Sequence, residues 1–267
     1  MARDNKKFTM ESIVEINIHE GLMKEQIIDF EKSEKDCKDA FESILSSSDL
    51  NEAEYYRADD FDELIDELIE AGAENWAIKT CIIKMQYITK SISNRKGIEY
   101  AIIIQKLCEL KRLSLAEEVL EVALKNVSEF RCYESLGIST SSKEELNNKS
   151  LALEIFQKAE DLAVSFSDFN SLADTIVDED YLGDKNYAKT VYQKAENLAE
   201  SFKDFLDLGQ SYGLYLDKNH ARKAFKKAEN LAQNFNDLKT LAKTIANENY
   251  LGDTVWEKEL LQKNKKS

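Results

Sequence analysis

Proline is absent from this chain of 267 residues, and glycine occurs only 8 times. Proline interrupts helices, and both residues shape the tight turns of β-hairpins. A sheet-rich protein would need more of both, whereas Ala, Leu, Glu and Lys, which favour helices, are abundant here. Hydrophobic residues make up 43% and charged residues 33%, which is typical of a packed globular protein. The composition therefore predicts an all-α fold.

Long apolar runs are also missing. No stretch of about 18 apolar residues occurs, which is the length that a membrane-spanning helix needs. The N-terminal stretch MARDNKKFTMESIVEINIHEG lacks the apolar core and cleavage site of a secretion signal. Four cysteines, Cys37, Cys81, Cys108 and Cys132, lack the close paired spacings of zinc sites and disulfide frameworks. We expect a cytoplasmic protein with buried free thiols and no membrane contact.

Catalytic motifs are equally scarce. The chain has 2 histidines, His19 and His220, and it lacks a phosphate-binding loop, a dinucleotide-binding glycine motif and a nucleophile elbow. His19-Glu20 lacks the second histidine of a zinc-protease motif. His220 replaces aromatic residues of the internal repeat, which favours a packed structural role. We expect no catalytic residue, no metal and no cofactor, and an enzyme that uses surface carboxylates is the outlying alternative.

Related segments recur in the second half of the chain. QKAED at 157–161, QKAEN at 193–197 and KKAEN at 226–230 lie 36 and 33 residues apart, a period typical of stacked repeat units. Around each, an alanine, a large residue four positions later and an alanine three positions after that share one helix face. The four sets are Ala116, Leu120 and Ala123; Ala152, Phe156 and Ala159; Ala188, Tyr192 and Ala195; and Ala221, Phe225 and Ala228.

A second pattern precedes these helices. It is clearest as Phe205, Leu208, Gly209 and Tyr212, which come before the set that begins at Ala221. This series of aromatic, Leu-Gly, Tyr, Ala and Phe resembles the tetratricopeptide (TPR) signature. The units that are 36 residues long are more similar to the Sel1-like relatives of TPR. Weaker copies of the first-helix pattern begin at Phe61, Tyr100, Tyr133, Phe169 and Leu238.

The resemblance covers about residues 61–262 and implies an α-solenoid of about six stacked helical hairpins, a TPR/Sel1-like superhelix. The closing proline of the signature is absent, and Glu257 stands where the final unit should have alanine. We expect three parts, which are a divergent N-terminal helical cap at 1–58, the repeat array at 59–262 and a frayed basic tail at 263–267.

The tetrapeptide YLGD occurs at Tyr181–Asp184 and again at Tyr250–Asp253, 69 residues apart. Its glycine and the acidic residues before it invite comparison with a calcium loop, but the fifth and twelfth positions of an EF-hand are wrong in both copies. We favour a structural turn, in which the glycine ends one helix in the left-handed conformation and the aspartate caps the next. LYLD at 214–217 keeps the aspartate without the glycine and should form a different turn.

The formal net charge of −15 is unevenly distributed. Residues 49–74 hold eleven acids and one base, whereas residues 218–267 hold eleven bases and six acids. An acidic body repels phosphates, and the basic end has no aromatic interleaving beyond Trp256, so we expect no direct binding of nucleic acid. The acidic block is either ordinary solvated helix surface or a surface that attracts a basic partner.

In TPR-like proteins the first helix of each pair lines a concave groove that binds a partner. The family's groove positions lie two before, one after and five after the leading aromatic. The resemblance carries this role onto Asp59, Asp62, Asp66, Gln105, Glu134, Asn170, Asp174, Lys203, Gln210, Asn236, Lys239 and Lys243. It implies a groove that is acidic at its N-terminal end and basic at its C-terminal end, and the equal alternative is that these are ordinary exposed residues. No first helix carries the Lys–Asn pair of the chaperone-tail clamp.

The resemblance implies a non-catalytic scaffold or adaptor that binds a partner protein through this groove. The skewed charge also fits a sharper alternative, an acidic immunity or antitoxin-type protein that neutralises a basic toxin such as a nuclease. The sequence leaves the identity of the partner and the oligomeric state open.

Overall fold

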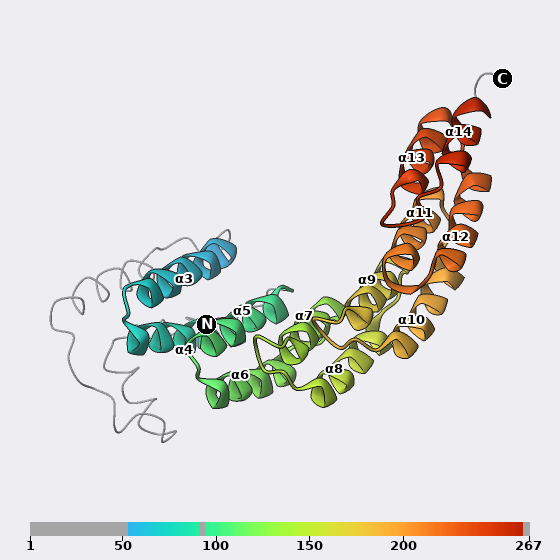
Figure 1. Ribbon diagram of the computed structural model, residues 1–267. Coiled ribbons are helices and arrows are strands. Elements are labelled where there is room, and N and C mark those ends of the chain that lie inside the picture. The colour runs from blue at the N-terminus through green and yellow to red at the C-terminus, as the bar shows by residue number, and fades with distance from the viewer. Residues whose placement is uncertain (1–52, 91–93, 264–267) are drawn as a thin grey trace, which may run out of the picture. The chain divides into compact units, whose positions relative to one another are not determined.

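The computed structural model describes residues 53–90 and 94–263 (Figure 1). These residues form twelve α-helices, α3 to α14, and one π-helical segment, η1, and they contain no strand. The predicted all-α class is therefore confirmed for the described part of the chain. Most of the expected N-terminal cap and the end of the expected basic tail lie outside the described residues.

The chain divides into two compact units, Met1–Ile82 and Ile83–Ser267. The division passes through α4 (Glu74–Lys90), so the first unit contains α3 (Ala53–Glu70) and the beginning of α4. The boundary expected between residues 58 and 59 falls inside α3.

A tight turn joins α3 to α4. Gly72 has a φ of +71°, a conformation that glycine adopts without strain. The N–H of Ala73 donates to the Leu68 carbonyl at 2.8 Å, which ties the turn to the end of α3. The buried face of α3 has helical spacing and consists of Phe61, Leu64, Ile65 and Leu68.

The second unit is a succession of helical pairs, in which each helix packs mainly on its neighbour in sequence. Figure 1 shows the odd-numbered helices on one side of this unit and the even-numbered helices on the other. The helices are α5 (Lys96–Glu109), α6 (Leu113–Asn126), α7 (Phe130–Ser141), α8 (Lys149–Leu162), α9 (Phe166–Val177), α10 (Lys185–Leu198), α11 (Phe202–Ser211), η1 (Tyr212–Leu216), α12 (Lys218–Leu231), α13 (Phe235–Ala246) and α14 (Thr254–Lys263). The pairs are α5–α6, α7–α8, α9–α10, α11–α12 and α13–α14.

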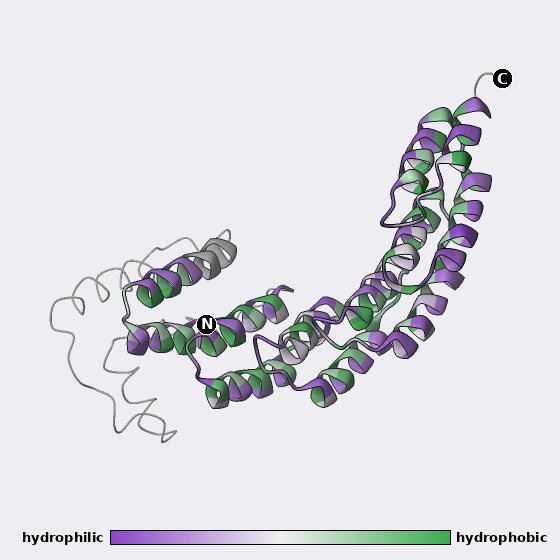
Figure 2. Cartoon of the chain, in the orientation of Figure 1, coloured by the Kyte–Doolittle hydropathy of each residue, from purple (hydrophilic) through white to green (hydrophobic). Residues whose placement is uncertain are grey.

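The core of the second unit lies between the two rows of helices. All four alanine–large residue–alanine sets are buried, with exposed fractions of 2% or less. Figure 2 shows hydrophobic residues along one side of these helices and hydrophilic residues along the other. Because each set comes from an even-numbered helix, the repeat that is visible in the sequence is the packing face of that helix on its odd-numbered partner.

The YLGD turns have the predicted form. Gly183 and Gly252 both adopt a φ of +70°, where a side chain would be strained. The carboxylate of Asp184 accepts two backbone N–H groups in the first turn of α10, at 3.0 and 2.9 Å. That of Asp253 accepts one in the first turn of α14, at 2.9 Å. Both aspartates therefore cap a helix, as expected.

One detail of the expected turn is wrong, because the glycine does not end the preceding helix. Helix α9 ends at Val177, and the chain then makes a loop before it reaches the glycine. The N–H of Asp184 donates back to the Ile176 carbonyl at 3.0 Å, and the N–H of Asp253 donates to the Ile245 carbonyl at the same distance. The left-handed glycine therefore turns the chain back onto the last turn of the helix.

A lysine from the preceding pair holds each YLGD turn. Lys149 Nζ donates to the Leu182 carbonyl at 3.0 Å, and Lys218 Nζ donates to the Leu251 carbonyl at 3.1 Å. Each lysine is the first residue of its helix, α8 or α12. The corresponding residue of α10, Lys185, instead lies 3.5 Å from Glu179. The lysine contact thus recurs at every second pair.

The glycine-free copy LYLD forms a different turn, as predicted. Here α11 continues directly into η1, and Asp217 caps α12 by accepting two N–H groups at 2.8 and 2.9 Å. Gly213 lies against the backbone of the next turn, because a Cβ at this position would come within 2.7 Å of the Tyr250 Cα. A wider helical turn replaces the left-handed glycine in this unit.

Candidate partner-binding surface

The expected groove positions of the second unit lie on α5, α7, α9, α11 and α13, which we call the odd-helix row. Neighbouring helices of the row contact each other directly, α5 with α7, α7 with α9, α9 with α11 and α11 with α13. The row is therefore a continuous surface that helices from successive pairs build together.

Similar caps start α9, α11 and α13. Ser165 and Ser201 each accept the N–H of an aspartate three residues later, at 3.1 Å in both cases. Each aspartate carboxylate in turn accepts a hydrogen bond from the serine N–H, which completes a capping box. Asn234 caps α13 through the N–H of Asp237 at 3.0 Å. The spacing from Ser165 to Ser201 to Asn234 is 36 and 33 residues, a repeat signal that our reading of the sequence missed.

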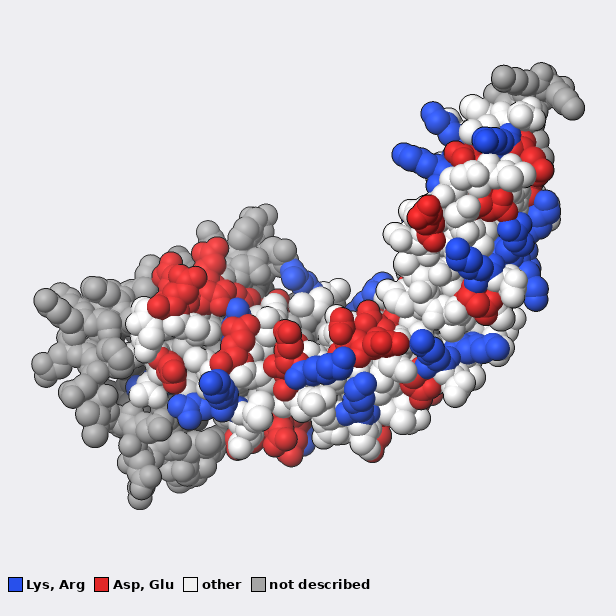
Figure 3. Space-filling view, viewed as in Figure 1, with Lys and Arg blue, Asp and Glu red and all other residues white. Residues whose placement is uncertain are grey.

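In the first unit, α3 carries the acidic end of the expected surface. Asp62 and Asp66 lie on α3 and are half-buried, whereas the side chain of Asp59 lies outside the described residues. Figure 3 shows acidic side chains gathered over α3, where Glu63, Glu67 and Glu70 are exposed.

Five of the expected residues on the odd-helix row are exposed. Gln105 on α5 donates a hydrogen bond to Glu109 at 3.1 Å on the same helix. Gln210 on α11 is half-buried. Figure 3 shows Lys and Arg gathered over α12 and α13. The exposed set is Gln105, Lys203, Asn236, Lys239 and Lys243.

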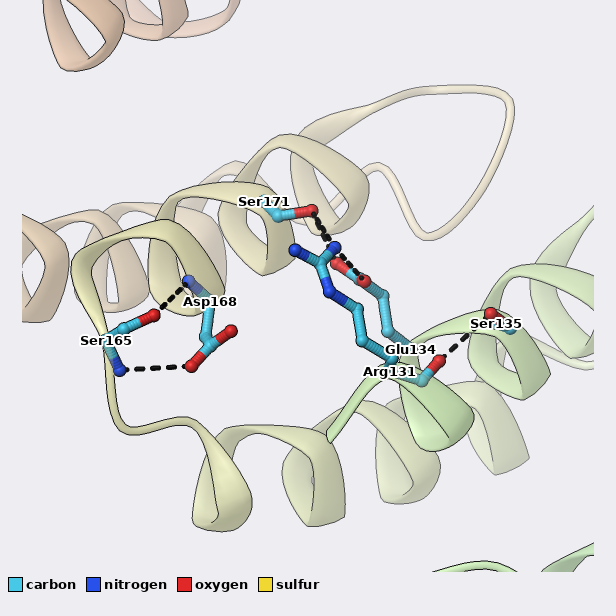
Figure 4. A network of polar contacts seen from close by, with 6 residues as sticks. All are labelled: Arg131, Glu134, Ser135, Ser165, Asp168 and Ser171. Atoms are coloured by element: carbon cyan, nitrogen blue, oxygen red, sulfur yellow. Dashed lines mark hydrogen bonds and ion pairs between the residues drawn. The ribbon is translucent and has the colours of Figure 1, made fainter. Parts of the chain in front are cut away.

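Glu134 is different, because it is 6% exposed and is held between two helices. Its Oε1 accepts from the Ser171 hydroxyl of α9 at 2.7 Å, and its Oε2 accepts from the Arg131 guanidinium at 3.1 Å. Figure 4 shows Arg131 and Ser171 beside the Glu134 carboxylate, while the Ser165–Asp168 cap lies apart at the start of α9. Burial raises the pKa of Glu134, against the opposing effects of Ser171 and Arg131.

Asp174 joins three helices. Its Oδ1 accepts from the Tyr192 hydroxyl of α10 at 2.5 Å, and its Oδ2 accepts from the Ser211 hydroxyl at the end of α11 at 3.1 Å. Asn170, one turn earlier on α9, donates to Asp174 at 3.3 Å and to Ser211 at 3.0 Å. We call these four residues the Asp174 junction.

The surroundings of Asp174 disfavour its charge. Burial raises the pKa of Asp174 to about 6, and the nearby carboxylates of Asp207 and Glu134 add to this, against the hydrogen bonds from Tyr192 and Ser211. Burial and the Asp174 charge likewise raise the pKa of Tyr192, which therefore keeps its proton and acts as a donor.

The middle of the odd-helix row thus differs from its two ends. At the ends, the expected residues face solvent, whereas Glu134, Asn170 and Asp174 bond to other residues of the chain and tie neighbouring helices together. Their pairing with Ser171 and Ser211 was not visible in the sequence, because each serine belongs to the next repeat. A role for these three residues in contacting a partner stays a prediction.

A second polar cluster lies where α10, η1 and α12 meet. The His220 ring makes an edge contact with Tyr212, with centroids 5.5 Å apart, and its Nδ1 lies 2.6 Å from the Asp217 carboxylate. The Tyr212 hydroxyl donates to Glu196 at 3.1 Å, and Lys227 donates to the same carboxylate at 2.8 Å. The packed structural role that was predicted for His220 agrees with these contacts.

Cys81, Cys108 and Cys132 are buried thiols outside any disulfide, as predicted, while Cys37 lies outside the described residues. Burial raises the pKa of Cys108 to about 11, so its thiolate is rare at neutral pH. Within residues 53–90 and 94–263, no group of three His, Cys, Asp or Glu side chains is arranged to hold a metal ion. None of the described helices is both long and apolar enough to span a membrane.

No protein-family model, curated protein or solved structure matches this chain. Its function is therefore inferred from its own residues.

Proposed function

We propose that this protein is a non-catalytic scaffold or adaptor, an α-solenoid of six TPR/Sel1-like hairpins that binds a partner protein. In this proposal α3 and α4 form the first hairpin, and the five pairs of the second unit follow. The partner contacts α3 and the exposed residues of the odd-helix row. The proposal includes no reaction, metal or cofactor.

The observation that carries this proposal is a contrast between positions within the repeat. Positions that pack one helix on its partner keep the same chemistry, as in the four buried sets of the even-numbered helices. The exposed position five residues after the leading residue of the odd-numbered helices changes from Gln105 on α5 to Lys243 on α13, although the backbone geometry repeats. Packing does not require this variation, and a chemically varied surface on a regular scaffold is suited to recognition of one partner.

Charge suggests the chemistry of that partner. Helix α3 carries a dense set of carboxylates, and Lys239 and Lys243 lie exposed on α13. We therefore propose that the partner presents a basic segment to α3 and an acidic segment to α13. Charged surfaces of this kind speed association and fix the orientation of a partner, and added salt weakens their effect.

The neutralising protein is the second candidate. The acidic block at residues 49–74 favours it, because a basic toxin or nuclease surface is the complement of a block with eleven acids and one base. In this version α3 covers the basic active surface of the toxin. The two candidates differ in their partner, since only the second requires a toxic protein whose activity stops on binding. An enzyme that uses surface carboxylates is the third and weakest candidate.

Charge reversal tests the proposal. The full chain is used to capture proteins from native cell extract, alongside the variant Asp62→Lys/Asp66→Lys. The matched control is Glu117→Lys/Glu121→Lys, which makes the same change of charge at the same spacing on an exposed face of α6. Circular dichroism checks that all three proteins are folded.

We expect the unmodified chain and the α6 control to retain a common partner, and the α3 variant to lose most of it. Raising the salt concentration from about 50 mM to about 300 mM should also release the partner. Equal capture by both variants overturns the role of α3. A captured protein that arrests growth alone, but not together with this chain, favours the neutralising function over the adaptor function.

A further inference from the structure

At the Asp174 junction a half-buried carboxylate forms no ion pair with the basic side chains that the structure describes. Among the described residues, Glu134 has Arg131 at 3.1 Å, Glu160 has Lys194 at 2.8 Å and Glu196 has Lys227 at 2.8 Å. Asp174 instead receives hydrogen bonds from two hydroxyls and one amide. The ionised form is thus held by neutral donors alone.

The titratable groups that other elements place near Asp174 are acidic or neutral rather than basic. Helix α7 contributes Glu134, α11 contributes Asp207, α10 contributes the Tyr192 hydroxyl and η1 contributes the Tyr215 hydroxyl. Four basic residues of the neighbouring helices contact other groups. Arg131 binds Glu134, and Lys194 binds Glu160. Lys149 binds the Leu182 carbonyl, and Lys158 lies over the Tyr133 ring. Lys203 lies exposed at the start of α11, near Asp207.

The junction also has a spare acceptor. The Oδ1 atom of Asn170 is buried and receives no hydrogen bond from the described residues. A proton on Asp174 would add one donor to a site that has an unused acceptor, and the Ser211 hydroxyl can rotate to accept from it. The site can therefore hold the neutral carboxylic acid without leaving its proton unpaired, and the neighbouring carboxylates of Asp207 and Glu134 disfavour the charged form.

We propose that the Asp174 junction is a proton-operated joint in the odd-helix row. When Asp174 holds a proton, α9 is bound firmly to α10 and α11. When the proton leaves, the half-buried negative charge faces Asp207 and Glu134, and the junction opens more often. The proton is exchanged with water, and no other atom is transferred.

The joint lies between two neighbouring helices of the odd-helix row. Asp174 and Asn170 both bond to Ser211 and so link α9 to α11, and Tyr192 links α9 to its own pair partner. Opening this site therefore loosens both the contact within one pair and the contact between two pairs. This inference does not depend on a partner, although a joint in the row would also make partner binding depend on pH.

The direction of the effect follows from linkage. The pKa of about 6 lies above the ordinary value of 3.8, so the closed junction binds a proton more tightly than the open one. The closed state is favoured as pH falls from about 7 towards 4, and this gain is lost as pH rises through 6. The proton is bound with a pKa of about 6 in the closed junction and 3.8 in the open one. Linkage then predicts that the opening equilibrium rises about tenfold between pH 5 and pH 8.

Hydrogen exchange of the full chain tests the joint. Exchange of backbone amides in α9, α10 and α11 is measured from pH 5 to pH 8 and corrected for the intrinsic pH dependence. We expect their protection to fall about tenfold over this range, and amides of α5 and α6 to change less. Asp174→Asn keeps the shape of the side chain without its charge, so its protection should not depend on pH. Glu154→Gln on the exposed face of α8 is the matched control and should behave like the unmodified chain.

The inference is wrong if Asp174→Asn and the unmodified chain give the same pH profile. If Asp174→Asn does not fold, a carbon-13 titration of the Asp174 carboxyl in the unmodified chain decides the matter. A midpoint near 6 supports the joint, and a midpoint below 4.5 overturns it. Asp207→Asn should lower the midpoint, because it removes a neighbouring negative charge. None of these readouts depends on partner capture in the charge-reversal experiment. Failure of the proposed function and failure of this inference can therefore be told apart.

Discussion

The ring of Phe156 on α8 lies against Gly137 on α7 so closely that a Cβ at residue 137 would come within 2.4 Å of the ring. The same contact joins Phe225 on α12 to Gly209 on α11, also at 2.4 Å. In α7 and α11 the glycine of the Leu-Gly step therefore makes room for the aromatic residue of the partner helix. The phenylalanine ring on one helix and the missing side chain of glycine on the other together set how closely the two helices approach.

Alanine at either glycine should destabilise the protein. In an open helix interior, replacing glycine by alanine stabilises by about 0.5–1 kcal/mol. At Gly137 or Gly209 the added methyl group overpacks a buried contact, so we expect a loss of about 1–3 kcal/mol in the free energy of unfolding. Urea unfolding measures this change. Phe156→Leu should recover part of the loss in Gly137→Ala, and a stabilised Gly137→Ala would contradict the contact.

A buried ion pair joins α4 to α5 within the second unit. Lys84 Nζ lies 2.8 Å from the Glu99 carboxylate, and the two side chains are 0% and 7% exposed. Among the described residues, Lys84→Met leaves the buried carboxylate with one basic neighbour, Arg95, at 4.0 Å. We expect a loss of about 3–5 kcal/mol in the free energy of unfolding, because a buried charge without its partner is costly.

A second substitution separates loss of charge from loss of packing. Lys84→Met/Glu99→Gln removes both charges and should be more stable than Lys84→Met alone. Equal instability of the single and double variants would show that packing of the lysine chain, and not the ion pair, is what matters. Chemical denaturation of the full chain measures both.

The YLGD turns give a third prediction. Alanine at Gly183 or Gly252 must adopt a φ of +70°, so each substitution should cost about 1–2 kcal/mol in the free energy of unfolding. Asparagine tolerates this conformation better and should cost less at both sites. Thermal unfolding measures the series. Equal effects of alanine and asparagine would mean that loss of space, rather than backbone conformation, is responsible.

Asp253 gives a prediction for acidic pH. A backbone N–H of α14 and the Arg222 guanidinium lower the pKa of Asp253, against a small opposing effect of burial. A carboxyl whose folded pKa is lowered stabilises the protein above its unfolded pKa, about 4, and that contribution is lost as pH falls through the folded value. Asp253→Asn keeps a capping side chain without the charge.

We therefore expect Asp253→Asn to unfold at a lower temperature than the unmodified chain at pH 7, and the difference to shrink below about pH 4. Asp174 should show the opposite trend, because its pKa is raised. Differential scanning calorimetry of Asp253→Asn and Asp174→Asn across the pH range checks both signs. A constant difference between Asp253→Asn and the unmodified chain at every pH would mean that the charge of Asp253 contributes nothing.

Much of the local structure could be predicted because it depends on spacing within one repeat. The Ala152, Phe156 and Ala159 set lies on one helix face whatever its neighbours do, and the capping role of Asp184 follows from its place before α10. The serine caps at Ser165 and Ser201 were equally readable from the S-x-x-D pattern, and we did not use it.

The polar centre of the odd-helix row could not be predicted in the same way. The position of Asp174 in the repeat matches that of Gln210 and Lys243, which lie on α11 and α13. What distinguishes Asp174 is the Ser211 hydroxyl of the next odd-numbered helix and the Tyr192 hydroxyl of α10, which are 37 and 18 residues away. Burial of that carboxylate is a property of three helices together, so a pattern on one helix does not contain it.

The lysine contacts to the YLGD turns have a consequence for how such an array can be lengthened. Lys149 reaches Leu182 and Lys218 reaches Leu251, while the LYLD turn at 214–217 has no left-handed glycine, and the corresponding lysine, Lys185, lies beside Glu179 instead. In a duplicated block of residues 149–217, each lysine equivalent to Lys149 would again lie beside a YLGD turn. Duplication of a single hairpin would place two turns of the same kind in succession. One lysine would then have no turn carbonyl to which it could donate. The smallest length by which this array grows without new sequence is thus two hairpins, 69 residues.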